Sequence, residues 1–60
     1  MRPLAFKLEV MAGNLRYYPA NEAAALLLRL TGGRCFGPAD LELIMQLGFT
    51  LTVNGEPYGL

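Results

Sequence analysis

The sequence has no histidine and no tryptophan, and it contains a single cysteine, Cys35. One cysteine cannot form an intramolecular disulfide, and one cysteine without histidine cannot supply the four ligands of a structural zinc site. A cysteine nucleophile also needs a neighbouring base, which is most often histidine. These absences argue against an enzyme, and we expect no catalytic residue, no cofactor and no metal.

Long apolar runs are also missing from the sequence. No stretch approaches the roughly 20 apolar residues that a membrane-spanning helix needs. The first residues lead into alternating polar and apolar positions, unlike the apolar centre of a secretion signal. A free cysteine fits a reducing compartment. We therefore expect a cytoplasmic protein that has no membrane partner.

The chain is short, with 60 residues of which 53% are hydrophobic. This length predicts a single compact domain over residues 1–60. A chain of this size buries only about 60% of the surface that it exposes when unfolded. Self-association is a common additional source of stability for such chains, so a homodimer is a further expectation.

The charges are divided unevenly along the chain, although the net charge is zero. The first 34 residues contain all five bases and two acids, which gives +3. The remainder contains three acids and no base, which gives −3. This asymmetry fits either a modest dipole on a solvated surface or two faces for two kinds of partner.

Residues 4–18 have the pattern of a β-hairpin. Apolar side chains occupy every second position of residues 4–11, which is typical of a half-buried strand. Gly13-Asn14 predicts a two-residue turn, and residues 15–18 return as the second strand. This register places Val10 opposite Tyr17 and Glu9 opposite Tyr18.

Two helices and a third strand follow the hairpin. Asn21 is a typical helix N-cap, and Gly32-Gly33 predicts the end of that helix. Pro38 can begin a second helix that runs to Leu47, since its missing N–H costs nothing in the first turn. Residues 49–53 alternate again as a strand. Asn54-Gly55 then predicts a turn, after which Pro57 restricts residues 56–60 to an edge or a loose tail.

The expected fold is therefore α+β with the order β-β-α-α-β. Two short helices pack on one face of a three-stranded antiparallel sheet. The predicted core is Phe6, Leu8, Val10, Tyr17, Leu27, Leu30, Leu41, Ile44, Phe49 and Leu51. Both helices are more apolar than surface helices usually are. Either they cover each other, or one edge docks a second copy or a partner.

The remaining motifs predict little chemistry. Residues 31–37 are glycine-rich and precede a helix, but they lack the Gly-Lys-Ser/Thr of a phosphate loop and fit an interhelical connector. A recognition helix that carries acids instead of bases argues against a helix-turn-helix. A hairpin that enters the major groove of DNA is an alternative, although it has few bases.

The candidate binding residues form two groups of polar or aromatic side chains. The outward face of the hairpin carries Lys7, Glu9, Arg16 and Tyr18. The exposed side of the second helix carries Asp40, Glu42 and Gln46. We favour the hairpin face, because tyrosine and arginine are enriched among residues that dominate interface energetics.

The size and element order resemble small phage and mobile-element inhibitor proteins, including anti-CRISPR proteins. The segments that carry this resemblance are the hairpin around Gly13-Asn14, the helices at 21–30 and 38–47, and the strand at 49–53. The resemblance implies a non-catalytic protein that occupies a working surface of a host complex such as a CRISPR effector. Some members imitate DNA with acidic faces, from which this chain departs because its net charge is zero.

The sequence thus favours a small protein-binding module that inhibits a host protein complex. A small dimeric DNA-binding regulator that uses the N-terminal hairpin is the first alternative. An accessory subunit of a larger assembly is the second.

Overall fold

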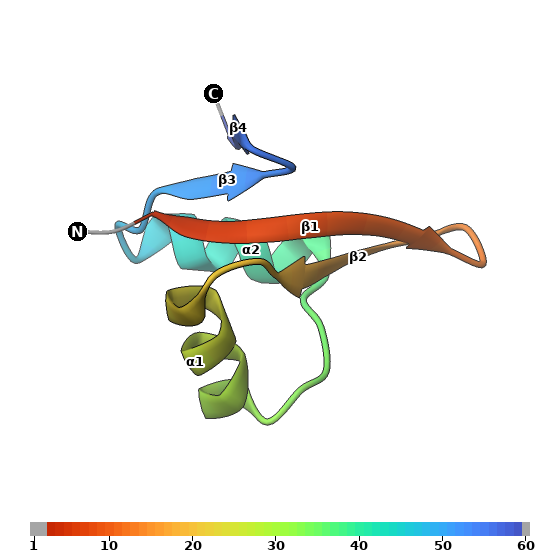
Figure 1. Ribbon diagram of the computed structural model, residues 1–60, viewed down its shortest axis with the longest axis horizontal. Coiled ribbons are helices and arrows are strands. Elements are labelled where there is room, and N and C mark those ends of the chain that lie inside the picture. The colour runs from red at the N-terminus through yellow and green to blue at the C-terminus, as the bar shows by residue number, and fades with distance from the viewer. Residues whose placement is uncertain (1–2, 60) are drawn as a thin grey trace.

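The computed structural model describes residues 3–59, within which the chain forms a mixed sheet and two helices. In chain order the elements are β1 (Leu4–Met11), β2 (Asn14–Pro19), α1 (Glu22–Thr31), α2 (Pro38–Gln46), β3 (Leu51–Val53) and β4 (Glu56–Pro57) (Figure 1). Arg2, which belongs to the basic half of the sequence, and Leu60, in the predicted edge segment, lie outside the described residues.

The sheet has the strand order β2-β1-β3-β4. The outer pairs are antiparallel, whereas β1 and β3 are parallel, with Leu4 opposite Leu51. The α+β class is confirmed, but the predicted three-stranded antiparallel sheet is wrong in strand number and direction. The reason is that α2 returns the chain to the start of β1, where the Leu4 N–H donates to the Thr50 carbonyl at 2.8 Å. β3 therefore leaves in the same direction as β1 (Figure 1).

The first hairpin turns at Ala12-Gly13 and not at Gly13-Asn14. Both turn residues have positive φ, 53° for Ala12 and 79° for Gly13, as a type I′ turn requires. The predicted pairs are therefore wrong by two positions: Leu8 lies opposite Tyr17, and Glu9 opposite Arg16. In this register two apolar pairs form, Leu8 with Tyr17 and Val10 with Leu15, and Glu9 meets the opposite charge of Arg16. Pairs of both kinds stabilise antiparallel strands.

The helices begin and end where the local signals place them. The Asn21 side chain accepts a hydrogen bond from the Ala24 N–H at 2.9 Å, and Gly32 ends α1 with φ 77°. α2 begins at Pro38, and the Asp40 carboxylate accepts a hydrogen bond from the Gly37 N–H at 2.9 Å. These caps satisfy backbone groups that a helix leaves unpaired at its ends.

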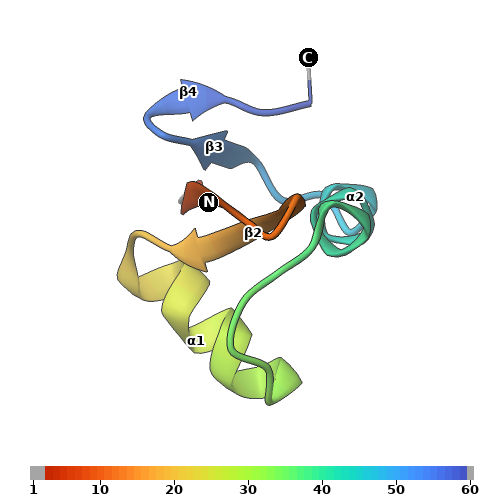
Figure 2. The ribbon, with the colours of Figure 1, turned by 90° about the vertical axis from the view of Figure 1, so that its right-hand side faces the viewer.

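The core lies on the sheet face that carries the even-numbered residues of β1. Its buried members are Leu4, Phe6, Tyr17, Ala24, Phe36, Leu41, Ile44 and Leu51. Seen along the strands, α2 lies against one side of the sheet and α1 lies beyond the β2 edge (Figure 2). Leu8, Leu27 and Phe49 are partly buried against this core, as predicted.

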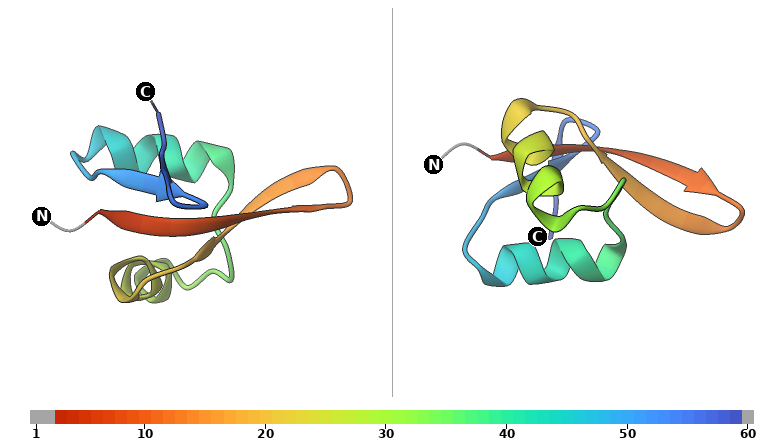
Figure 3. Two further views of the ribbon diagram at one scale, coloured as in Figure 1. Left: turned by 45° about the horizontal axis from the view of Figure 1, so that its top comes forward. Right: turned by 90° about the horizontal axis from the view of Figure 1, so that it is seen from below.

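Two predicted core residues are exposed. Val10 is 65% exposed because the tip of the first hairpin projects past both helices as an arm (Figure 3). Leu30 is 83% exposed, and it belongs to the last turn of α1, at the end of the helix that lies farthest from the sheet (Figure 1). Alternation and helical periodicity identify the apolar side of an element, but they do not show where along that element its packing partners end.

A backbone bridge at Phe36 ties the segment between the two helices to the sheet. Phe36 forms an isolated antiparallel bridge with Tyr17 on the outer side of β2. Its ring packs edge-on against Phe6, with centroids 5.3 Å apart and an interplanar angle of 85°. This bridge sets where the chain begins α2.

Candidate binding faces

Among the described residues, neither helix covers one of the two faces of the sheet. In Figure 1 α2 lies behind the strands and α1 below them, which leaves the near face of β1 and β2 uncovered. The register puts Lys7 opposite Tyr18 and Glu9 opposite Arg16 on this side, away from the core. We call these four residues the open face. The structure thus brings together the four hairpin residues that the sequence predicted.

Charges on the open face largely balance. The Lys7 Nζ and Glu9 Oε2 atoms are 3.7 Å apart, and the two side chains are 69% and 46% exposed. An exposed ion pair of this kind contributes only about 0–1 kcal/mol to stability. Arg16 is directly opposite Glu9 across the strands. The face therefore presents both signs of charge over a short distance and has no strong field of either sign.

Tyr18 supplies the aromatic surface of the open face. Its side chain is half-buried, and its hydroxyl donates to the Met11 Sδ at 3.5 Å. The ring thus leans along the strands towards the arm. A tyrosine held in this way offers contact area with little rotational freedom left to lose on binding.

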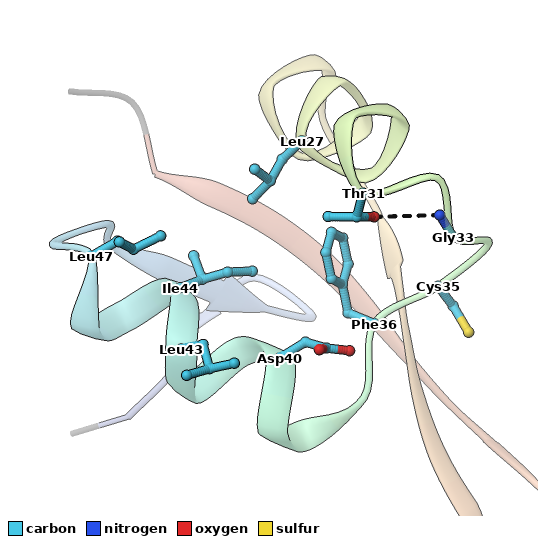
Figure 4. A pocket seen from close by; sticks show the side chains of 9 residues that line it. All are labelled: Leu27, Thr31, Gly33, Cys35, Phe36, Asp40, Leu43, Ile44 and Leu47. Carbon is cyan, nitrogen blue, oxygen red and sulfur yellow. Dashed lines mark hydrogen bonds between the residues drawn. The ribbon is translucent and has the colours of Figure 1, made fainter.

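Cys35 lies beside the open face, which sequence reasoning missed. The Arg16 guanidinium Nη1 donates to the Cys35 Sγ at 3.6 Å. Cys35 precedes the Phe36 bridge, and its sulfur points away from the interhelical groove (Figure 4). No local sequence pattern indicates that Cys35 lies near Arg16, because the bridge that brings them together joins residues 19 positions apart (17 and 36).

The three candidate residues of α2 lie away from the open face, on the helix behind the sheet (Figure 1). All three side chains of Asp40, Glu42 and Gln46 are exposed. Asp40 accepts the Gly37 N–H and so caps its own helix, in agreement with its expected place in the first turn. The α2 residues do not share one surface with the hairpin residues or with each other, because Asp40 lines a groove between the two helices, whereas Glu42 borders a separate shallow hollow beside Pro38.

A groove separates the two helices. It has a volume of about 380 Å³ and is lined by Leu27 of α1, Phe36 of the connector, and Leu43, Ile44 and Leu47 of α2 (Figure 4). The exposed fractions of Leu43 and Leu47 are 59% and 74%. The alternative in which the helices cover each other is therefore wrong for these positions. We call this feature the leucine groove.

The Tyr17 phenol has a raised pKa. Burial in the core raises the pKa of its phenol above the ordinary value, and the neighbouring Tyr58 raises it further. The two rings meet at 6.0 Å between centroids. The neutral phenol is therefore the form that the fold favours.

Within residues 3–59, no three His, Cys, Asp or Glu side chains gather as metal ligands would. In the same part of the chain, neither helix has the length and apolar character to cross a membrane. Comparison with protein-family models, with curated proteins and with solved structures finds no match to this chain.

Proposed function

We propose that this protein is a small binding module that contacts a partner protein through the open face of its sheet. The observation that carries this proposal is the pairing of Lys7 with Tyr18 and of Glu9 with Arg16 on an uncovered pair of strands. An aromatic ring and a planar guanidinium then lie on one exposed surface. Residues of these two types dominate the energetics of many protein interfaces.

The partner surface that best fits this face is mixed in charge and contains an apolar patch for Tyr18. Arg16 can give a carboxylate two parallel hydrogen bonds, since its guanidinium is a planar fork. Lys7 is already paired with Glu9 and would therefore contribute less than Arg16 to partner binding. Inhibition of a host complex, such as a CRISPR effector, is the specific form of this proposal that follows from the resemblance in size and element order.

The experiment is a titration of the captured partner with matched variants. We expect Tyr18→Ala to raise the dissociation constant at least about 30-fold, as loss of an interface hot spot does. Arg16→Glu should slow association with an acidic partner. Glu56→Arg, a charge reversal on β4 at the opposite edge of the sheet from β2, is the control and should leave affinity unchanged. Circular dichroism checks that each variant is folded.

Two results would contradict this assignment. The first is unchanged affinity for both Tyr18→Ala and Arg16→Glu. The second is loss of binding in Leu43→Glu alone, which would move the partner contact to the helices. If the partner surface is a basic nucleic-acid channel, Glu42→Arg should weaken binding instead.

DNA binding by the same hairpin is the competing function, and Lys7 and Arg16 favour it. Phosphate contacts by Lys and Arg make DNA affinity fall steeply with salt. Glu9, which neighbours both bases, works against this attraction. Titrations of duplex DNA and of the captured partner, each at two salt concentrations, separate the functions. Affinity for DNA should fall steeply with salt, whereas affinity for a protein partner bound through Tyr18 should depend less on salt.

A further inference from the structure

The leucine groove has the size and the lining of a small-molecule site. Its volume of about 380 Å³ lies within the range of roughly 300–1,000 Å³ that such sites occupy. Most of its lining is apolar and comes from both helices and the connector. Sites of this kind combine an apolar lining with a few polar groups that orient the ligand. The polar groups of the groove therefore indicate which ligand fits it.

Most of the polar groups around the groove already have partners or point elsewhere. The Thr31 hydroxyl donates to the Leu28 carbonyl at 2.8 Å and accepts from the Gly33 N–H at 3.4 Å. The Cys35 sulfur points away from the groove (Figure 4). Of the described residues that line the groove, Asp40 is the charged one. Its carboxylate is thus the group that can select the ligand.

The Asp40 carboxylate extends from the first turn of α2 towards the connector that carries Phe36 (Figure 4). One of its oxygens, Oδ2, accepts the Gly37 N–H at 2.9 Å, and the side chain as a whole is exposed. Within residues 3–59 it forms no ion pair with lysine or arginine. Arg34 lies in the connector between two lining residues, but it does not line the groove itself. The groove therefore carries an uncompensated negative charge at its rim.

A carboxylate beside an apolar wall favours one class of ligand. An ionised carboxylate only accepts hydrogen bonds, and its bonds with charged donors are about twice as strong as those with neutral donors. An alkylammonium ion supplies both the positive charge and the donors, and its hydrocarbon part can lie on the leucines. A fatty acid of the same length would bring a second negative charge to Asp40 instead.

We infer that the leucine groove binds a small lipophilic amine. Its hydrocarbon part lies between α1 and α2, in contact with Leu43 and Leu47, and its ammonium group pairs with Asp40. The exposed fractions of these leucines, 59% and 74%, are the apolar surface that the ligand covers. The site shares no residue with the open face, so this inference and the proposed function can fail independently.

Titration of the full chain with two probes of equal length tests this inference. Decylammonium and decanoate have the same hydrocarbon tail and opposite charges, and methyl NMR spectra report where each one binds. We expect decylammonium to shift the methyl signals of Leu43 and Leu47. It should bind at least about threefold more tightly than decanoate, because an exposed ion pair forms with one probe and like charges meet with the other.

Three variants assign this preference to the groove. Asp40→Asn removes the charge but keeps an amide oxygen that can accept the Gly37 N–H, so it should bind both probes about equally. Glu42→Gln is the matched control: it removes the same charge from the same helix, but Glu42 borders a different hollow, and the preference should remain. Leu47→Ala should weaken both probes. Circular dichroism checks that each variant is folded.

Three results would overturn the inference. The first is equal affinity of the wild type for the two probes. The second is a preference for decylammonium that persists in Asp40→Asn. The third is the absence of probe-induced shifts at Leu43 and Leu47. If sedimentation equilibrium then also gives a mass near twice 6.6 kDa, a second copy of the chain covers the groove in place of the amine.

Discussion

Tyr17 and Phe36 exchange both backbone hydrogen bonds, with N–O distances of 2.8 and 2.9 Å, although Phe36 belongs to no strand. This pair joins the connector between the helices to the outer side of β2. Both side chains are buried, and the Phe36 ring also meets Phe6. The bridge therefore determines where α2 begins relative to the sheet.

Phe36→Ala should destabilise the protein by about 3–5 kcal/mol, because it leaves a cavity beneath both helices. A domain of this size has only about 3–5 kcal/mol of stability, so most of the variant should be unfolded. Phe49→Ala is the control, since Phe49 is only partly buried and should cost less. Urea unfolding followed by circular dichroism measures both. Equal losses of stability in the two variants would mean that Phe36 contributes no more to stability than a partly buried residue does.

Stability should decline at high pH because of Tyr17. Its pKa is raised in the folded protein, so the folded state keeps the phenol proton when the unfolded chain has lost it. The stabilisation is complete below about pH 10, the unfolded pKa, and is lost as the pH rises towards the folded pKa. Melting temperatures at a series of pH values give the slope. Tyr17→Phe should make the melting temperature less dependent on pH in this range. An unchanged slope in this variant would mean that another group causes the loss of stability.

Asn21→Ala should cost about 1–2 kcal/mol. The Asn21 side chain accepts the Ala24 N–H and donates to the Pro3 carbonyl, both at 2.9 Å, so it joins α1 to the start of β1. Asn14→Ala is the matched control on the exposed arm and should change stability by less than about 0.5 kcal/mol. Thermal unfolding compares the two. A similar cost for both would show that the cap contributes nothing particular.

Cys35→Ser should leave folding and partner binding unchanged. The contact of Arg16 with the sulfur is long, at 3.6 Å, and a serine hydroxyl can accept the same hydrogen bond. The melting temperature and the partner titration are the two measurements. Loss of binding by a folded Cys35→Ser variant would show that the thiol takes part in function.

Short-range signals predicted the local structure well. Asn21 and Gly32 bound α1 as expected, and the alternation in β1 placed Lys7 and Glu9 on the face opposite the core. These predictions depend on residues within a few positions of each other. The hairpin turn was harder, because a turn at Gly13-Asn14 preserves the same faces and differs only in which residues are opposite.

Long-range pairing could not be predicted in the same way. Nothing near Leu4 indicates that Leu51 will lie beside it, and the apolar pattern of residues 49–53 fits either strand direction. The exposure of Val10 and Leu30 also depends on how far the helices extend over the sheet. Arg16 and Cys35 become neighbours through the Phe36 bridge. Because this bridge is itself a long-range contact, their proximity could not be predicted either.

The parallel pairing of β1 with β3 has a consequence for the order of events during synthesis. β1 is central in the sheet, yet its partner strand begins 47 positions later (4 and 51). At roughly 5–20 residues per second, the ribosome adds β3 about two to seven seconds after the first hairpin is complete. During that interval one edge of β1 has unpaired amide and carbonyl groups beside Leu4 and Phe6, which is the kind of edge that pairs with other chains. The nascent chain is therefore most prone to aggregate before Leu51 is made, and the pairing of β3 with β1 removes this exposed edge.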